Sequence, residues 1–189
     1  MPYKLVYPPA HNDTYVKATS HYDYRFEAFF TTDPSKSLIG NSSEKAWGAY
    51  YPSGVGGTGA NQRFHIDLGK ASRVVGIHYE NFHDAGGFTD VGAKNFTFQG
   101  STTPGAFADL TYATDTNWAT LAKSQASLDQ HISADTTDPK YISVYNQNLY
   151  RYYAFKFADN WGYRDGCSYS WIQIRRIVLQ VYTPQIISF

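Results

Sequence analysis

Apolar and polar residues alternate along much of this chain with the two-residue period of a β-strand. The clearest example is the range 62–69, whose apolar positions are Phe64, Ile66 and Leu68. The polar positions between them are Arg63, His65 and Asp67. A turn over 69–72 then leads into an apolar run from Val74 to Tyr79. Side chains alternate between the two faces of a strand, so the pattern predicts two strands in a sheet with one buried face and one face in water.

The same alternation recurs in the second half of the chain. It predicts further strands at Lys94–Gln99, Tyr141–Tyr145, Arg151–Phe157 and Trp171–Tyr182. In the last of these the apolar phase shifts between Ile174 and Ile177, which predicts a β-bulge or bend near Arg175 and Arg176. Only 117–127 has the pattern of a short helix, and 101–115 and 122–140 have the composition of long surface connections.

Strands separated by clusters of Gly, Asn, Asp and Ser, without the spacing of βαβ units, favour an all-β antiparallel sandwich. The length of 189 residues is typical of one domain, here 1–189, with a core over about 15–182. No internal repeat or linker divides the chain.

Charge and composition narrow the class of partner. Sixteen basic and sixteen acidic residues cancel, so the chain lacks the basic surface that nucleic acid or an anionic membrane requires. We expect no membrane insertion, because no apolar stretch approaches the length of a bilayer span, and the first residues do not have the layout of a signal peptide. Cys167 is the only cysteine, so an internal disulfide is impossible. The compartment stays open, with a virion or a cell-surface assembly among the options.

Several short segments occur in a characteristic order. They are Gly40-Asn41 with Trp47, Phe64–Gly69 with Val74–Tyr79, Phe96–Ser101 with Asn117-Trp118, Tyr150–Phe155 and Ile172–Leu179. This order resembles the discoidin domain, also called the coagulation factor V/VIII C-type domain, and its relative, carbohydrate-binding module family 32. The resemblance covers roughly 15–182. It implies a jelly-roll β-sandwich of the galactose-binding-like group, whose members bind glycans, lipids or proteins through loops at one end.

Two departures from that family concern calcium. Ile39 stands where the resemblance implies a calcium-binding Asp, and Arg175-Arg176 stands where many relatives have a calcium-binding Glu. Calcium prefers hard, mostly anionic oxygen ligands, which a neighbouring Arg opposes. We therefore expect no cofactor, with one alternative left open. In that alternative a structural Ca²⁺ is bound by backbone carbonyls together with Asp33, Asn41 and Glu44.

The best candidates for a binding site lie in two loops that should meet at one end of the sandwich. Sugar sites combine an aromatic surface for the C–H face of the sugar with polar groups that fix its hydroxyls. The candidate glycan-binding residues are His83, Asp84, Asn160, Trp161, Tyr163, Arg164, Trp47 and Tyr51. The alternative is that Phe82 and Trp161 close the ends of the core.

No catalytic motif stands out, so we expect a protein that binds and is not an enzyme. The Gly-rich run 54–59 lacks the preceding strand and following helix of a dinucleotide site. Glu80, Asp84 and Asp90 could supply a carboxylate pair for glycoside cleavage, but nothing in the sequence raises the pKa of any of them. His78, Glu80, His83 and Asp84 cluster at a strand end and form a weaker candidate for a metal or binding site.

The sequence thus favours glycan recognition or adhesion, with a glycan or glycoprotein surface as partner. The alternative is a structural role, as a decoration or appendage subunit of a viral or phage particle or another protein assembly. The aromatic loops would then be subunit contacts. Lipid-headgroup binding would need apolar loop tips flanked by basic residues, and Arg63 and Arg164 offer too few.

Overall fold

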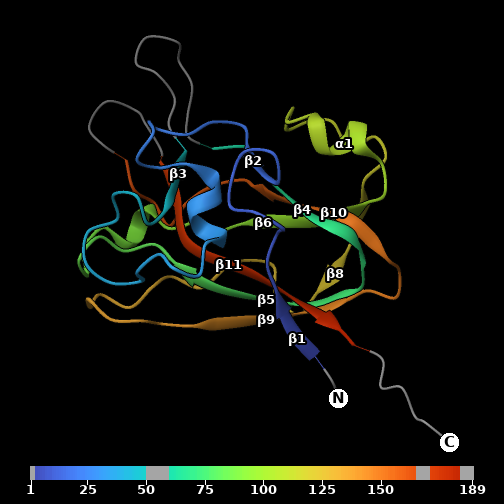
Figure 1. Cartoon of the computed structure of the whole chain (residues 1–189). Coiled ribbons are helices and arrows are strands. Elements are labelled where there is room, and N and C mark those ends of the chain that lie inside the picture. Colours follow the sequence, from blue (N-terminus) through green and yellow to red (C-terminus); the bar gives the residue numbers. More distant parts are fainter. Residues whose placement is uncertain (1–2, 50–59, 165–170, 184–189) are drawn as a thin grey trace, which may run out of the picture.

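The computed structural model describes residues 3–49, 60–164 and 171–183 and shows two β-sheets packed face to face (Figure 1). The ladders between the named strands are antiparallel. The predicted all-β jelly-roll sandwich is therefore confirmed. Within the described ranges, no helix is long and apolar enough to cross a membrane.

The first sheet consists of β1 (Tyr3–Val6), β3 (Trp47–Ala49), β5 (Val74–Asn81), β8 (Ala122–Lys123), β9 (Lys140–Tyr145) and β11 (Ile172–Tyr182). Its order is β1-β11-β5-β9-β8, and β3 also pairs with β11. The second sheet consists of β2 (Val16–Ala18), β4 (Gln62–Ser72), β6 (Phe96–Ser101), β7 (Ala119–Thr120) and β10 (Tyr150–Phe157), in the order β2-β4-β10-β6-β7. Three short helical segments complete the described fold: η1 (Ala28–Thr32), η2 (Thr89–Val91) and α1 (Pro104–Ala108).

The core lies between the inner faces of the two sheets and consists largely of aromatic side chains from the second one. Phe155 of β10 is fully buried, with its ring centroid 4.8 Å from that of Phe98 and 5.7 Å from that of Phe96. The first sheet contributes mainly aliphatic residues, including Ile177 and Leu179 of β11. The apolar positions that alternate in the sequence are those that point inward.

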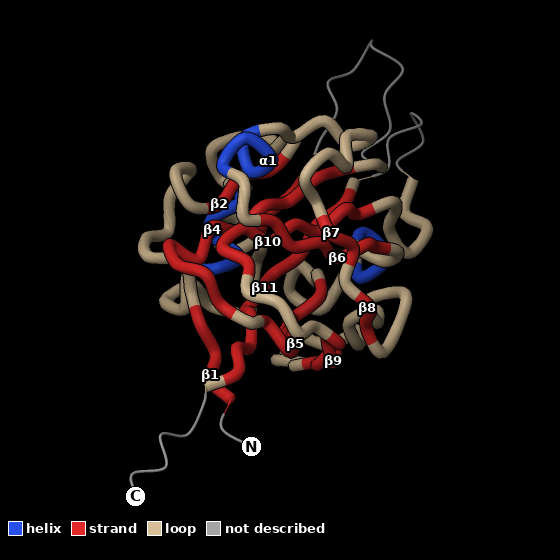
Figure 2. Tube along the Cα trace, turned by 90° about the vertical axis from the view of Figure 1, so that its right-hand side faces the viewer, coloured by secondary structure: helices blue, strands red, loops and turns tan. Residues whose placement is uncertain are grey.

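The outer face of the second sheet does not face water, so the prediction of a wet face was wrong. Arg63 and His65 are fully buried, and Asp67 is 5% exposed. The segment around α1, which we expected to be a surface connection, folds over β4 and β10 (Figure 2). Phe107 of α1 stacks on Tyr152 of β10, with the ring centroids 5.1 Å apart.

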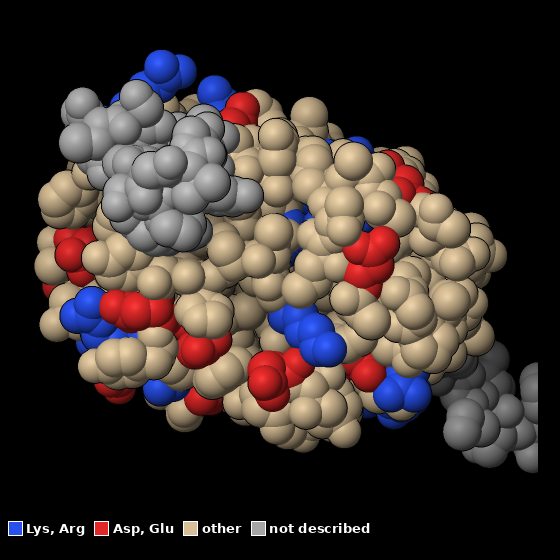
Figure 3. Space-filling model, turned by 90° about the horizontal axis from the view of Figure 1, so that it is seen from above, with Lys and Arg blue, Asp and Glu red and all other residues tan. Residues whose placement is uncertain are grey.

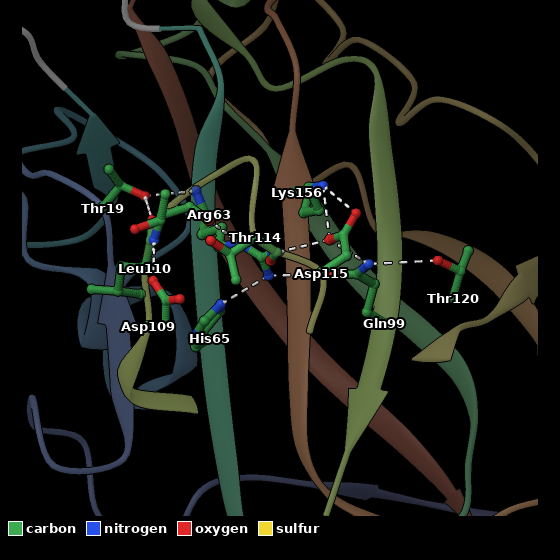
Figure 4. Close-up of polar contacts among 11 residues, drawn as sticks. Thr19, Arg63, His65, Gln99, Asp109, Leu110, Thr114, Asp115, Thr120 and Lys156 are labelled. Atoms are coloured by element: carbon green, nitrogen blue, oxygen red, sulfur yellow. Dashed lines mark hydrogen bonds and ion pairs between the residues drawn. The ribbon is translucent and has the colours of Figure 1, made fainter. Parts of the chain in front are cut away.

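Arg63 explains how this covering layer is attached. Its Nε donates to the carbonyl oxygen of Thr111 at 2.9 Å, and its Nη2 donates to Asp115 at 2.8 Å and to the carbonyl oxygen of Thr114. Its Nη1 donates at 3.2 Å to Gln99 on β6, which lies beyond β10 in the same sheet (Figure 4). A guanidinium presents five donors in a fixed fork, so one side chain holds a loop without secondary structure against two strands.

Two other expectations concern local structure. The helix expected over 117–127 is wrong, because this segment contributes the short strands β7 and β8. The expected irregularity in the last strand is confirmed. The pairing of β11 with β5 slips between Ile174 and Arg176, so Arg175 is the extra residue of a bulge.

Burial of His65 predicts a loss of stability in acid. Its Nδ1 lies 2.9 Å from the carbonyl oxygen of Phe107, which requires a proton on Nδ1, and desolvation lowers its pKa from 6.5 to about 4. Between pH 6.5 and pH 4, His65 is therefore protonated in the unfolded chain but stays neutral in the folded protein. This group alone should cost up to about 3 kcal/mol of the free energy of unfolding as the pH falls from 6.5 to 4, and nothing further below pH 4.

Urea unfolding at about pH 7 and about pH 4.5 checks this. Burial also lowers the pKa values of His78 and His83, so the test compares variants. The loss between the two pH values should be smaller for His65→Gln than for the wild type. It should be unchanged for His21→Gln, whose side chain is 49% exposed. Equal losses for the wild type and His65→Gln would contradict the prediction.

Candidate functional site

An aromatic pocket of about 280 Å³ lies where the segment after β5 meets the loop between β10 and β11. We call it the aromatic pocket, and it is lined by Phe26, Ser42, Phe82, Asp84, Phe88, Val91, Tyr163, Trp171 and Gln173. Phe82 and Val91 are buried with Ala46 in a small apolar cluster beside the main core. Tyr163 and Trp171 pack on this cluster from the outside.

Side-chain amides at two strand ends shape the pocket. Asn81, the last residue of β5, donates through Nδ2 to the carbonyl oxygens of Ala93 at 2.8 Å and Asp129 at 2.7 Å. Asn160, shortly after β10, donates to the carbonyl oxygens of Tyr163 at 3.1 Å and Trp171 at 2.6 Å. Both amides satisfy carbonyl groups that lie outside the ladders, which fixes the backbone of the loops that present the aromatic rings.

The two loops meet, as the sequence predicts. The amide of Trp161 donates to the carbonyl oxygen of Asp90 at 3.0 Å, and Ala93 forms an antiparallel bridge with Asn160. Phe88, just before η2, and Tyr163 face each other edge to face, with the ring centroids 6.3 Å apart. The aromatic wall therefore combines residues more than seventy positions apart in the chain.

The pocket contains polar groups suited to hydroxyl groups. Gln173 is 2% exposed, and its Oε1 has no hydrogen-bond partner among the described residues. Its side chain lies across Gly48 on β3, where a Cβ atom would come within 2.8 Å of Nε2, so the glycine leaves room for the amide. Asp84 accepts a hydrogen bond from the amide of Ser42 through Oδ1 at 2.7 Å. A buried acceptor without a partner costs free energy, so the position of Gln173 is not explained by packing alone.

Only part of the predicted set lies at the pocket. Asp84 and Tyr163 line it, and Asn160 supports it from behind. His83 is 1% exposed and turned away: Nε2 lies 2.8 Å from the carbonyl oxygen of Leu38, and Nδ1 accepts from the amide of Gly86 at 3.0 Å. The prediction that Trp47 belongs to the binding site was wrong. Trp47 is fully buried in the core, where it contacts Phe64 and Phe157.

The remaining predicted residues lie outside this lining. Trp161 is half-buried beneath Lys94, whose Nζ is 4.6 Å from the ring centroid. Arg164 is exposed and is not part of the pocket wall. Tyr51 lies outside the described residues. The sequence pattern did not predict six of the lining residues: Phe26, Ser42, Phe88, Val91, Trp171 and Gln173. For Gln173 the one local signal was its position on a predicted strand, two residues before the bulge.

Comparison with known proteins identifies the fold. No family profile matches the sequence, and no curated protein matches it either. Among solved structures, the F5/8 type C domain of a Bacteroides fragilis protein superposes with a TM-score of 0.56 at 10% identity, covering 94% of this chain and 95% of that one. The chain has the discoidin fold.

Two carbohydrate-binding modules of family 32 have the same fold. The module of AlyQ, in complex with 4,5-unsaturated mannuronic acid, has a TM-score of 0.53 at 18% identity, covering 93% of this chain and 97% of that one. The module from C. perfringens NanJ, in complex with galactose, has a TM-score of 0.53 at 12% identity, covering 87% and 91%. At these identities the likeness establishes the discoidin fold alone.

The metal candidates are dispersed on this discoidin fold. The carboxylate of Asp33 accepts two hydrogen bonds from Ser35: the amide and the hydroxyl of Ser35 both donate to Oδ1, at 2.9 and 2.7 Å. Asn41 and Glu44 are exposed. Across the parts of the chain that the structure describes, no three His, Cys, Asp or Glu side chains gather as a metal-binding group. The expected absence of a cofactor stays a prediction, and so does its alternative, a structural Ca²⁺ bound by Asp33, Asn41 and Glu44.

Asn160→Asp should destabilise the discoidin fold at this end. The carboxylate keeps the oxygen that accepts from the amide of Gly162 at 2.8 Å, but it replaces Nδ2 by an oxygen facing two carbonyl groups. We expect a loss of about 2 kcal/mol in the free energy of unfolding, measured by urea titration. Asn41→Asp, on an exposed residue, is the matched control and should change little. Equal stability of the two variants would contradict this account.

Proposed function

We propose that this protein is a non-catalytic glycan-binding module and that the aromatic pocket is its binding site. The observation that supports this most is the combination, in one pocket, of an aromatic wall with the polar side chains of Asp84 and Gln173. Aromatic rings pack on the C–H face of a sugar, while an amide oxygen and a carboxylate accept hydrogen bonds from its hydroxyls. Tyr163 and Phe88 are the proposed platform, and Asp84 and Gln173 are the proposed acceptors.

The size and charge of the site favour the end of a glycan chain. A volume of about 280 Å³ is at the small end for ligand pockets, and the described lining includes no Lys or Arg. On the face of the molecule in Figure 3, basic and acidic residues are interspersed, without a large area of one sign. Both features favour a ligand recognised by shape and hydroxyl groups. Structural neighbours form complexes with galactose and with 4,5-unsaturated mannuronic acid, which supports glycans in general as the class of ligand.

A glycan array followed by calorimetry with the best ligand tests this function. Tyr163→Ala should weaken binding by about 10- to 100-fold, because it removes roughly 1.5–3 kcal/mol of aromatic contact. Asp84→Asn should weaken it less, since the amide oxygen still accepts one hydrogen bond. Tyr145→Ala removes a tyrosine that is 66% exposed on β9, away from the pocket, and is the control.

The melting temperature separates binding from packing. Tyr163→Ala should bind the glycan weakly. Its melting temperature should be close to that of the wild type, because Tyr163 is only partly buried. A wild-type protein that retains no glycan on the array, or a Tyr163→Ala variant that binds as well as the wild type, would contradict the proposal. A large fall in melting temperature for this variant would instead support a role in closing the end of the core.

A second candidate function, subunit contact within an assembly, is favoured by the outer face of the first sheet. Large exposed residues gather there: Tyr3 and Leu5 of β1, and Tyr141 and Tyr145 of β9, are 41–66% exposed. The cross-strand register from Leu5 through Gln180 and Gly76 to Ser143 places them on one face. Exposed apolar patches of this kind mark contact surfaces.

Sedimentation velocity over a range of concentrations tests this second function. If this face joins subunits, the wild type should associate, and the double change Tyr141→Ser with Tyr145→Ser should reduce association. A strictly monomeric wild type that binds a glycan would exclude self-assembly through this face and leave the aromatic pocket as the functional surface.

A further inference from the structure

Five successive backbone carbonyl groups in the loop between η1 and β3 turn toward the outer face of the first sheet. We call residues 36–40 the carbonyl loop. The carbonyl oxygen of Lys36 accepts a hydrogen bond from Nη2 of Arg176 at 2.6 Å, and that of Leu38 lies 2.8 Å from Nε2 of His83. The remaining three carbonyl groups, of Ser37, Ile39 and Gly40, all face Arg175.

The guanidinium of Arg175 is surrounded by carbonyl oxygens from two segments of the chain. Its Nη1 lies 3.5 Å from the oxygens of both Ser37 and Ile39, and its Nη2 donates to the oxygen of Gly40. Its Nε donates to the oxygen of His83, after β5, at 2.9 Å. The whole residue is inaccessible to solvent. This arrangement is a cation in a shell of backbone oxygens, which is also how proteins bind many metal ions in loops.

The dipoles of the surrounding carbonyl groups compensate most of the charge of Arg175. Among the described residues, no carboxylate forms an ion pair with Arg175. Burial lowers the pKa of Arg175, and the more distant carboxylates of Asp84, Asp135 and Glu80 oppose that shift. A guanidinium has so high a pKa that it stays charged even so. A buried charge is tolerated only where hydrogen bonds satisfy it, so the guanidinium needs these carbonyl groups. The buried carbonyl groups in turn need a donor, which the guanidinium supplies.

The bulge in β11 places the side chain of Arg175 on the outer face of the first sheet. In a regular strand, Arg175 and Arg176 would point to opposite faces, and one of them would enter the core. Because Arg175 is the extra residue between the pairs Ile174–Asn81 and Arg176–Glu80, both arginines reach the outer face. They then hold opposite ends of the carbonyl loop, at Lys36 and at Gly40.

The groups that surround Arg175 do not fit the calcium ion that the resemblance to the discoidin family implies. Ile39 supplies no carboxylate. On β11, the positively charged Arg175 stands where a calcium ligand would have to be negative. The carbonyl oxygens that could bind an ion already accept hydrogen bonds from the guanidinium. We propose that the Arg175 guanidinium takes the place of a structural calcium ion, so that this discoidin fold is held together by a cation built into its own chain.

The same contact positions the wall of the aromatic pocket, a role that rests on the proposed function. Gly40, with a φ of 74°, links the two segments, because its oxygen accepts from the amide of Ala85 at 3.0 Å and its amide donates to Asp135 at 2.7 Å. Directly beyond these residues, Ser42 binds Asp84. Arg175 is therefore a positioning residue that fixes Asp84 without touching the ligand.

Thermal unfolding of the protein without any sugar tests the proposal, using Arg175→Met to keep an unbranched apolar side chain and remove the guanidinium group. The melting temperature of the wild type should be the same in EDTA and in excess CaCl₂. Arg175→Met should melt about 10 °C lower, because four carbonyl oxygens, three of them in the carbonyl loop, lose their donor. The matched control is Arg25→Met, which removes a 43% exposed arginine paired with the partly exposed Asp23 and should shift the melting temperature by less than about 4 °C.

A charge reversal provides the second arm. Arg175→Glu places a carboxylate among the same carbonyl oxygens, so CaCl₂ should raise its melting temperature by about 5 °C or more relative to EDTA, whereas the wild type should not respond. The proposal is overturned by any of three results: a wild type whose melting temperature responds to calcium or EDTA, Arg175→Met with the same melting temperature as Arg25→Met, or Arg175→Glu with the same circular dichroism and melting temperature in CaCl₂ as in EDTA. Because no sugar is present, a failure of glycan binding would leave these outcomes unaffected.

Discussion

Buried arginine side chains that donate to backbone carbonyl groups hold the loops of this protein to its sheets. The loops that cover the two outer faces have few backbone hydrogen bonds of their own, and a buried carbonyl without a partner is costly. Arg63 satisfies the segment over the second sheet, and Arg175 and Arg176 satisfy the carbonyl loop over the first. Arg73, partly buried between β4 and β5, also donates to a loop carbonyl oxygen, that of Asn146. The planar fork of donors lets one residue secure several carbonyl groups at once.

The sequence predicted the inner faces of both sheets well because burial there follows the two-residue period. It also predicted the bulge, since the shift of apolar phase between Ile174 and Ile177 is a local signal. It could not predict that Arg63 and His65 are buried. An alternating strand reads as half-exposed, and only the tertiary fold decides whether another segment covers the polar face. The segment around α1 has no strong period of its own, so its position depends on contacts distant in sequence.

For the pocket, the sequence located the correct loops but not the side chains. Adjacent residues in a turn point in different directions, and hydrogen bonds choose between them. His83 turns inward to Leu38 and Gly86, while Asp84, the next residue, reaches the pocket. Gln173 was missed because a strand glutamine resembles any surface residue in sequence. What distinguishes it is the space above Gly48 on a neighbouring strand.

Binding in such a pocket depends on how firmly its separate segments are held before a ligand arrives. Its lining comes from the regions before η1 and β3, after β5, and around η2, together with the loop before β11. Side chains that take no part in the aromatic wall fix most of these regions: Asn81 binds the segment after η2, Asn160 the loop before β11, and Arg175 the segments before β3 and after β5. Ordering these segments on binding would cost free energy, so a lattice of side-chain to backbone hydrogen bonds already present in the free protein leaves more of the contact energy for affinity. On this fold, the polar residues behind the pocket therefore matter to recognition as much as the rings that face it.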